Sequence, residues 1–246
     1  MTQYTITDLE QLKDVEPDGT LSIFGLNLNE QEIKANAVYL YDCRGTYVSL
    51  AASQVFIDGG SRFYLINAAG ARTIDLRDTS VERIVAKDPL ECFAASKANV
   101  RTIELGDARF VSISRSWVDR LFSQSIEFVR LFEAYIGTAG SETGRPAIFA
   151  RAAAVGHTSW PFVDGGTDTR GYRINVFRGA MDAASGEAVT GYGQLAGAEP
   201  AVVITAGCRT FTSAEKAANH WRLNRTGVLP AVRRAVKLLK EKEVHS

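Results

Sequence analysis

Short runs of β-branched and aromatic residues alternate along this chain with polar turns that contain glycine. Residues 37–51 hold two such runs around Cys43-Arg44-Gly45, a pattern typical of a β-hairpin. Similar runs continue to residue 76, and no repeat of fixed period stands out among them. Antiparallel neighbours joined by tight turns account for this rhythm better than βαβ units do. The pattern predicts an α+β fold built on an antiparallel β-sandwich flanked by several helices.

A long aromatic segment in the middle of the chain predicts a helix over residues 114–137. Its large apolar residues recur at three- and four-residue intervals, and Gly137 follows as a typical residue after a helix end. These apolar residues are Trp117, Leu121, Phe122, Phe128, Val129, Phe132 and Tyr135.

Residues 212–244 predict two closing helices. Thr212 followed by Glu215 forms a capping box for the first helix, and Pro230 stands in the first turn of the second. The second helix is amphipathic, and its cations lie toward the end where the helix dipole favours them.

The chain reads as a single domain over residues 1–246, because no linker is long enough to divide it. Residues 20–113 and 147–206 are mainly strands in this interpretation. Residues 1–16 are interpreted as a projecting N-terminal helical arm, since a short terminal helix has little core of its own.

Composition narrows the classes of partner. Lys and Arg together number 28, as do Asp and Glu, so the chain as a whole carries no basic footprint for nucleic acid. No window approaches the ~20 uninterrupted apolar residues that span a bilayer, which indicates no membrane partner. Three cysteines without a C-x-x-C motif favour a reducing compartment. No two histidines stand at ligand spacing, so no metal site is expected.

Cys208 is the one candidate nucleophile, because it follows a β-branched run and precedes a capped helix. His157 precedes it by 51 residues, the order of a permuted papain-like cysteine hydrolase or acyltransferase. The capping signal starts four residues too late for a cysteine in the first helical turn. We therefore expect Cys208 to be a buried side chain at the end of its strand, and the catalytic pair remains the alternative.

The C-terminal helix offers a further alternative. Arg233, Arg234, Lys237 and Lys240 leave a basic surface beside its apolar face. We expect a solvated surface, and the alternative is a contact for RNA, phosphate or an acidic partner.

Three segments resemble the cypovirus polyhedrins, the matrix proteins of insect-virus occlusion bodies. They are AVYLYDCRGTYVSLAASQVFIDGG (37–60), NVRTIELGDARFVSISRSWVDR (99–120) and GCRTFTSAEKAANHW (207–221). The alanine- and glycine-rich region 147–200 departs from the pattern of that family.

The resemblance implies a self-assembling structural protein without enzymatic activity. It implies a β-sandwich that forms homotrimers and then a higher lattice, located in viral occlusion bodies in the host-cell cytoplasm. Virion surface proteins would be its partners until alkaline dissolution. The resemblance also implies bound nucleotides between subunits, although no cofactor is required and no residue here maps to such a site.

Overall fold

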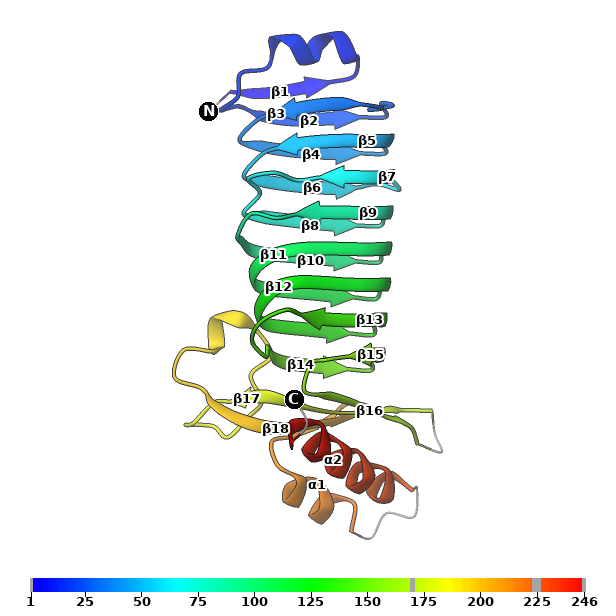
Figure 1. Ribbon diagram of the computed structural model, residues 1–246, viewed down its shortest axis with the longest axis vertical. Coiled ribbons are helices and arrows are strands. Elements are labelled where there is room, and N and C mark those ends of the chain that lie inside the picture. Colours follow the sequence, from blue (N-terminus) through cyan, green and yellow to red (C-terminus); the bar gives the residue numbers. More distant parts are fainter. Residues whose placement is uncertain (1, 169–170, 223–226, 245–246) are drawn as a thin grey trace.

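The β-branched runs do pair with one another, but each pairs in parallel with a run 17 to 19 residues away. In the computed structural model, which describes residues 2–168, 171–222 and 227–244, the chain winds as a β-solenoid (Figure 1). Its coils stack along one axis, and a smaller unit with two helices follows at the C-terminal end.

Each coil contributes strands to two parallel stacks. The β2 stack contains β1 (Gln3–Ile6), β2 (Thr20–Phe24), β4 (Ala37–Tyr41), β6 (Gln54–Asp58), β8 (Thr73–Arg77), β10 (Leu90–Ser96) and β14 (Ala147–Arg151). The β3 stack contains β3 (Gln31–Lys34), β5 (Arg44–Ala51), β7 (Arg62–Asn67), β9 (Ser80–Ala86), β13 (Tyr135–Ser141) and β15 (Ala154–Thr158). Two long strands, β11 (Asn99–Ser114) and β12 (Trp117–Phe132), turn the corner and belong to both stacks.

Columns of apolar side chains, most of them aliphatic, fill the space between the stacks. Equivalent positions on successive coils pair in register, so each buried side chain lies on the one from the coil before. Fully burying one such side chain is worth about 1.5–3 kcal/mol. One column, buried throughout, consists of Leu21, Val38, Val55, Ile74, Phe93, Val111, Val129 and Ile148.

The corners after the β2 stack share one backbone geometry. A residue with positive φ turns the chain, and its N–H bonds to the next coil, as Arg115 does to the Phe132 oxygen at 2.8 Å. From β4 onward these turning residues are Asp42, Gly60, Asp78, Lys97, Arg115, Glu133 and Ala152, of which the first six donate to the next coil in this way. The residue that follows each of them is small and buried: Cys43, Ser61, Thr79, Ala98, Ser116, Ala134 and Ala153.

This architecture overturns the predicted antiparallel sandwich flanked by several helices. Residues 37–51 form β4 and β5, which belong to different stacks and pair with other coils, so they are not a hairpin. A hairpin and a solenoid corner both show a short polar turn between two β-branched runs. Only the 17-to-19-residue spacing separates them, and the expectation that the chain lacks a repeat was wrong.

The helix predicted over residues 114–137 is also wrong, because β12 and the start of β13 occupy that segment. The buried positions include Val118, Leu121, Ile126 and Leu131, while Trp117 and Phe122 are exposed. In places two outward-facing residues, instead of one, separate the inward-facing residues of β12. Large residues then recur at intervals of three and four, and this imitates the spacing of a helix. Gly137 lies inside β13 and ends no helix.

The C-terminal unit is a four-stranded antiparallel sheet of β16 (Phe162–Thr167), β17 (Arg173–Met181), β18 (Glu199–Ala206) and β19 (Arg209–Phe211). Helices α1 (Ala214–His220) and α2 (Val228–Val244) lie where the sequence predicts helices. Ser213, rather than Thr212, caps α1 by accepting from the Lys216 N–H. The buried side of α2 packs on β16 and β17 around Ile174.

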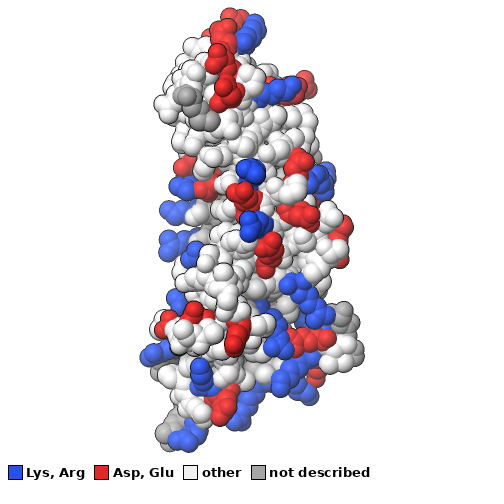
Figure 2. Space-filling view, turned by 90° about the vertical axis from the view of Figure 1, so that its left-hand side faces the viewer, with Lys and Arg blue, Asp and Glu red and all other residues white. Residues whose placement is uncertain are grey.

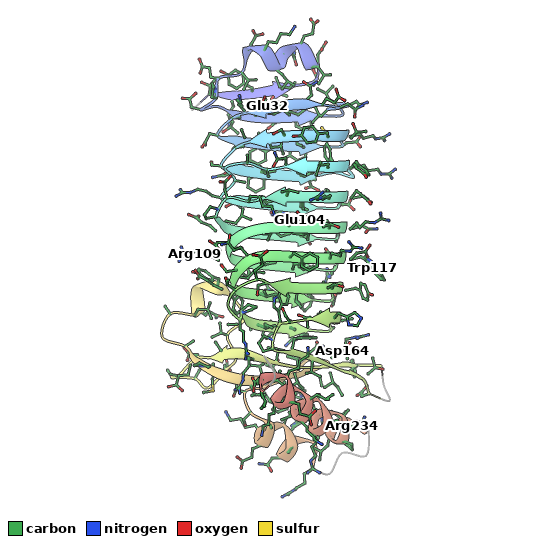
Figure 3. The ribbon with its side chains drawn as sticks, viewed as in Figure 1. Glu32, Glu104, Arg109, Trp117, Asp164 and Arg234 are labelled. Atoms are coloured by element: carbon green, nitrogen blue, oxygen red, sulfur yellow. The ribbon has the colours of Figure 1, made fainter. Side chains whose placement is uncertain are left out.

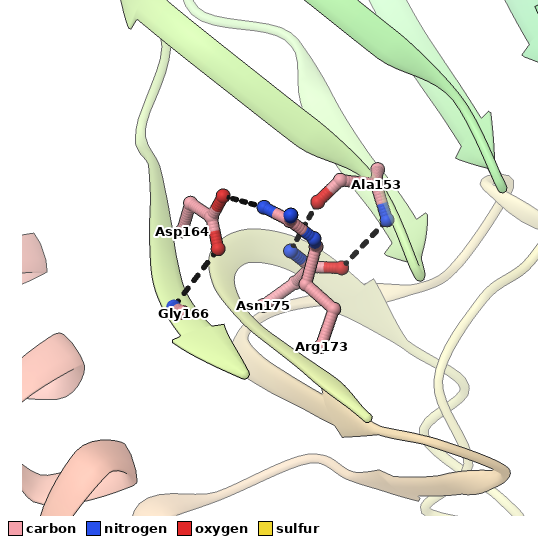
Figure 4. Close-up of polar contacts among 5 residues, drawn as sticks. All are labelled: Ala153, Asp164, Gly166, Arg173 and Asn175. Atoms are coloured by element: carbon pink, nitrogen blue, oxygen red, sulfur yellow. Dashed lines mark hydrogen bonds and ion pairs between the residues drawn. The ribbon is translucent and has the colours of Figure 1, made fainter. Parts of the chain in front are cut away.

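Two buried polar residues join this unit to the last coil of the solenoid. The Asn175 side chain donates to the Ala153 oxygen at 2.8 Å and accepts from the Ala153 N–H at 3.2 Å (Figure 4). The Thr205 hydroxyl donates to the Ala150 oxygen at 2.7 Å. Backbone groups that a further coil would have satisfied are therefore bonded to side chains of the C-terminal unit.

The first coil is covered at the opposite end. Strand β1 pairs with β2, and a 3-10 helix, η1 (Leu9–Asp14), follows it. Ile6 is buried, and Leu12 and Val15 pack against the core. The N-terminal segment is thus a cap on the solenoid, and the interpretation of residues 1–16 as a projecting arm was wrong.

Candidate functional site

The two residues predicted as a catalytic pair lie in different places. His157 is on β15, where it lines a hollow with Phe122 and Thr138. Cys208 lies at the turn between β18 and β19 and lines another hollow beside Arg151 and Lys216. No hydrogen bond joins the imidazole to the thiol in the described part of the chain. The alternative prediction of a Cys208–His157 nucleophile and base therefore finds no geometric support.

Cys208 is exposed, so the prediction that it is buried at the end of its strand was wrong. The sharp turn at Gly207, with a φ of 57°, carries it out of the sheet to the surface. Cys43, by contrast, is buried in a solenoid corner and Cys92 is half-buried. Burial raises the pKa of both of these thiols and disfavours their thiolates.

The glycine-rich segment 163–171 includes the end of β16, and residues 169–170 of this segment lie outside the described residues. Asp164 pairs with Arg173 and accepts from the Gly166 N–H at 2.9 Å (Figure 4). The Asp164 carboxylate therefore already has partners of its own. Among the described residues no group of His, Cys, Asp and Glu side chains is placed to hold a metal ion.

Acidic side chains gather at the N-terminal end of the rod (Figure 2). Residues 1–60 contain nine acidic and three basic residues. Those on and around η1 are all exposed: Asp8, Glu10, Asp14, Glu16 and Asp18. Turn and capping positions favour Asp and Glu, which explains why they concentrate in the cap.

Basic side chains predominate at the opposite end, where Arg234 lies far from Glu32 (Figure 3). Residues 200–246 contain nine basic and three acidic residues. Arg233, Arg234 and Lys240 are exposed on α2 and form no ion pair with any described residue. The predicted amphipathic character of α2 accounts for this surface, since its apolar side faces the sheet.

Helix α2 is held to the rod by its last turn. Arg178 pairs with Glu243, with one bond of 2.8 Å between Arg178 Nη2 and Glu243 Oε2, and this partner lowers the pKa of the Glu243 carboxyl. The pair therefore stabilises the fold above the ordinary pKa of glutamate, and the contribution is lost as the pH falls through the lowered value. Lys242 donates to the Thr158 oxygen at 3.0 Å, and burial lowers its pKa. The basic surface is thereby fixed relative to the solenoid.

The two ends of the molecule therefore carry opposite charge. The sequence predicted the basic surface of the C-terminal helix, but the total charge of zero concealed the acidic N-terminal end and so the division between the two ends. Counting charge separately over the two termini would have found it. Each end of the molecule can therefore attract a surface of opposite charge.

No protein-family model, curated protein or solved structure matches the chain. None of the helices in the described residues is long and apolar enough to cross a membrane. The sandwich implied by the resemblance to polyhedrins is contradicted by the solenoid. The homotrimer, the virion partners, the bound nucleotide and the cytoplasmic occlusion body remain predictions that rest on that resemblance alone.

Proposed function

We propose that this chain is a structural protein that assembles with copies of itself end to end, the acidic cap of one rod meeting the basic helix of the next. The observation that carries the proposal is the division of charge between the two ends: six net negative charges over residues 1–60 and six net positive charges over residues 200–246. Opposite charges on surfaces that face along the same axis favour one relative orientation of neighbouring rods.

The strands at the two ends of the solenoid limit the kind of contact that can form between rods. Strands β1, β3 and β15 at the two ends of the solenoid each pair with one neighbouring strand only, but exposed charges such as Glu32 and Lys34 on β3 disfavour pairing with a strand of another rod. The attraction between neighbouring rods is then the attraction between their oppositely charged ends. Such a contact forms reversibly, and it weakens with salt because surface charges are screened beyond about 8 Å at physiological ionic strength.

The size of the end faces predicts a weak contact. Strands of 4–8 residues span roughly 13–26 Å, and packed sheets lie about 10 Å apart, so an end face covers only a few hundred Å². Stable complexes bury about 800 Å² per partner. Assembly is therefore expected at high protein concentration and low ionic strength.

A cysteine hydrolase is the second function considered, and it has less support. Its two residues line separate hollows. A thiol without an imidazole beside it lacks the general base that such chemistry uses.

Charge reversal at one end at a time tests the proposed function. The cap variant Glu10→Lys/Asp14→Lys and the helix variant Arg233→Glu/Arg234→Glu each leave one end strong and the other weak. Each variant alone should sediment as a monomer at low salt. An equimolar mixture should form dimers that grow no further, because only one strong contact per pair remains.

A matched control reverses two charges in the middle of the rod, Arg120→Glu/Arg130→Glu. Both arginines are exposed and have no ion-pair partner among the described residues. This variant should assemble as the unchanged protein does, apart from a general effect of net charge. Monomeric behaviour of the unchanged protein at low salt, or long oligomers in the mixture of end variants, would refute end-to-end assembly.

A further inference from the structure

A polar hollow lies between the last coil and the C-terminal unit. Its lining contains more basic than acidic side chains and so favours an anionic ligand. Its volume is about 440 Å³. Strand β14, the loop after β17, strand β19 and helix α1 contribute its lining. The residues that carry its chemistry are Arg151, Lys216, Thr190, Thr210, Thr212 and Cys208.

The Arg151 guanidinium is held in place with most of its donors unused. Its Nη2 makes only long bonds, to the Thr210 hydroxyl at 3.4 Å and the Cys208 oxygen at 3.5 Å. Its Nε is buried and has no partner among the described residues. Arginine has five N–H donors in a planar fork, and a buried donor without an acceptor is costly. A planar set of donors with unused capacity suits an oxyanion.

A second cation lines the same hollow. Lys216 Nζ donates to the Thr212 hydroxyl at 3.3 Å, and that hydroxyl donates to the Gly186 oxygen at 3.0 Å. Neither Lys216 nor Arg151 forms an ion pair with a described carboxylate. Glu187, at the exposed rim, is the one acidic residue in the lining.

We propose that this hollow binds the phosphate group of a small phosphorylated molecule. A phosphomonoester carries nearly two negative charges at neutral pH, which two unpaired cations balance. Its three terminal oxygens accept from a planar guanidinium fork, an ammonium and threonine hydroxyls. Phe149 and Phe211 form apolar walls beside the polar groups, and these walls suit an organic substituent on the phosphate.

Cys208 provides a direct readout, because it lines the hollow and is the one exposed cysteine of the chain. Inorganic phosphate and phenyl phosphate should each slow its alkylation by iodoacetamide, with phenyl phosphate effective at lower concentration. Stronger protection by inorganic phosphate would identify the free ion as the ligand and would contradict the part of the proposal that assigns a substituted phosphate. Absence of protection by millimolar amounts of either probe would overturn the whole proposal.

Two substitutions locate the effect. Arg151→Gln and Lys216→Gln should each raise the dissociation constant for phenyl phosphate, measured by calorimetry, by about tenfold or more, the loss typical of a charge-assisted bond. Lys216 is exposed, so its substitution leaves the fold intact. Arg120→Gln removes an exposed cation on β12, outside both the hollow and the proposed end-to-end contact, and should leave the dissociation constant for phenyl phosphate unchanged. Equal weakening by all three variants would show a general charge effect and would overturn the site.

Discussion

At the residue scale, the fold depends on single side chains that satisfy the backbone where the winding stops. Asn175 has no exposed surface and bonds both the N–H and the oxygen of Ala153. Its neighbours Ile174 and Val176 are apolar and buried, so the local pattern gives no sign that a polar residue between them is also buried. Only the partner, 22 residues away, explains why an amide stands there.

Replacing Asn175 by alanine should therefore destabilise the protein strongly. Both backbone groups of Ala153 would lose their partner, and each unsatisfied buried group costs about 1–3 kcal/mol. We expect a loss of about 2–4 kcal/mol in the free energy of unfolding, measured by urea denaturation. Asn219→Ala on the exposed side of α1 is the matched control and should change stability little. Similar losses in both variants would contradict the capping role of Asn175.

The surroundings of Cys208 could be predicted from the sequence, but the exposure of its thiol could not. The β-branched run before it and the helix after it were both predicted, and both are present as β18 and α1. The exposure of the thiol depends on the turn at Gly207, which local sequence does not specify. The same limit hid Arg151, whose role in the hollow arises only when the C-terminal unit folds back on the last coil.

At the element scale, the strands of residues 37–76 were predicted, whereas strand β12 and the pairing of the strands were not. The β-branched runs of residues 37–76 are strands, as the pattern indicated. Their partners lie on the next coil, and local turn signals cannot distinguish this from a hairpin. The small residues at the corners, from Cys43 to Ala153, recur every 18 or 19 residues, and this was the signal available in the sequence.

Gly137 tests the stacking of the coils. In the helical interpretation it would follow a helix end, whereas in the solenoid a Cβ at this position would lie 2.7 Å from the Asp119 oxygen. Neighbouring coils would have to move apart to accept Gly137→Ala. We expect a loss of about 1–3 kcal/mol in the free energy of unfolding, the usual cost of overpacking.

Gly193→Ala provides the control for this substitution. A Cβ at Gly193 meets nothing within 4 Å, and its φ is not in the left-handed region. The free energy of unfolding of the Gly193→Ala variant should stay within about 0.5 kcal/mol of that of the unchanged protein. A tolerated alanine at position 137 would argue against the close approach of β12 and β13.

At the scale of the whole molecule, the covered ends and the divided charge define a polar rod. A total charge of zero conceals a negative cap and a positive C-terminal unit. The fold places these segments at opposite ends because each coil adds to the same axis. Composition alone could not show this separation, since it depends on the chain winding in one direction from first coil to last.

Small-angle X-ray scattering at low ionic strength tests end-to-end assembly most directly, because it reports length and cross-section separately. As protein concentration rises, the radius of gyration should increase while the radius of gyration of the cross-section stays that of a single rod. Added salt should return the long particles to monomers. A cross-section that grows with concentration, or a length that never changes, would contradict the account.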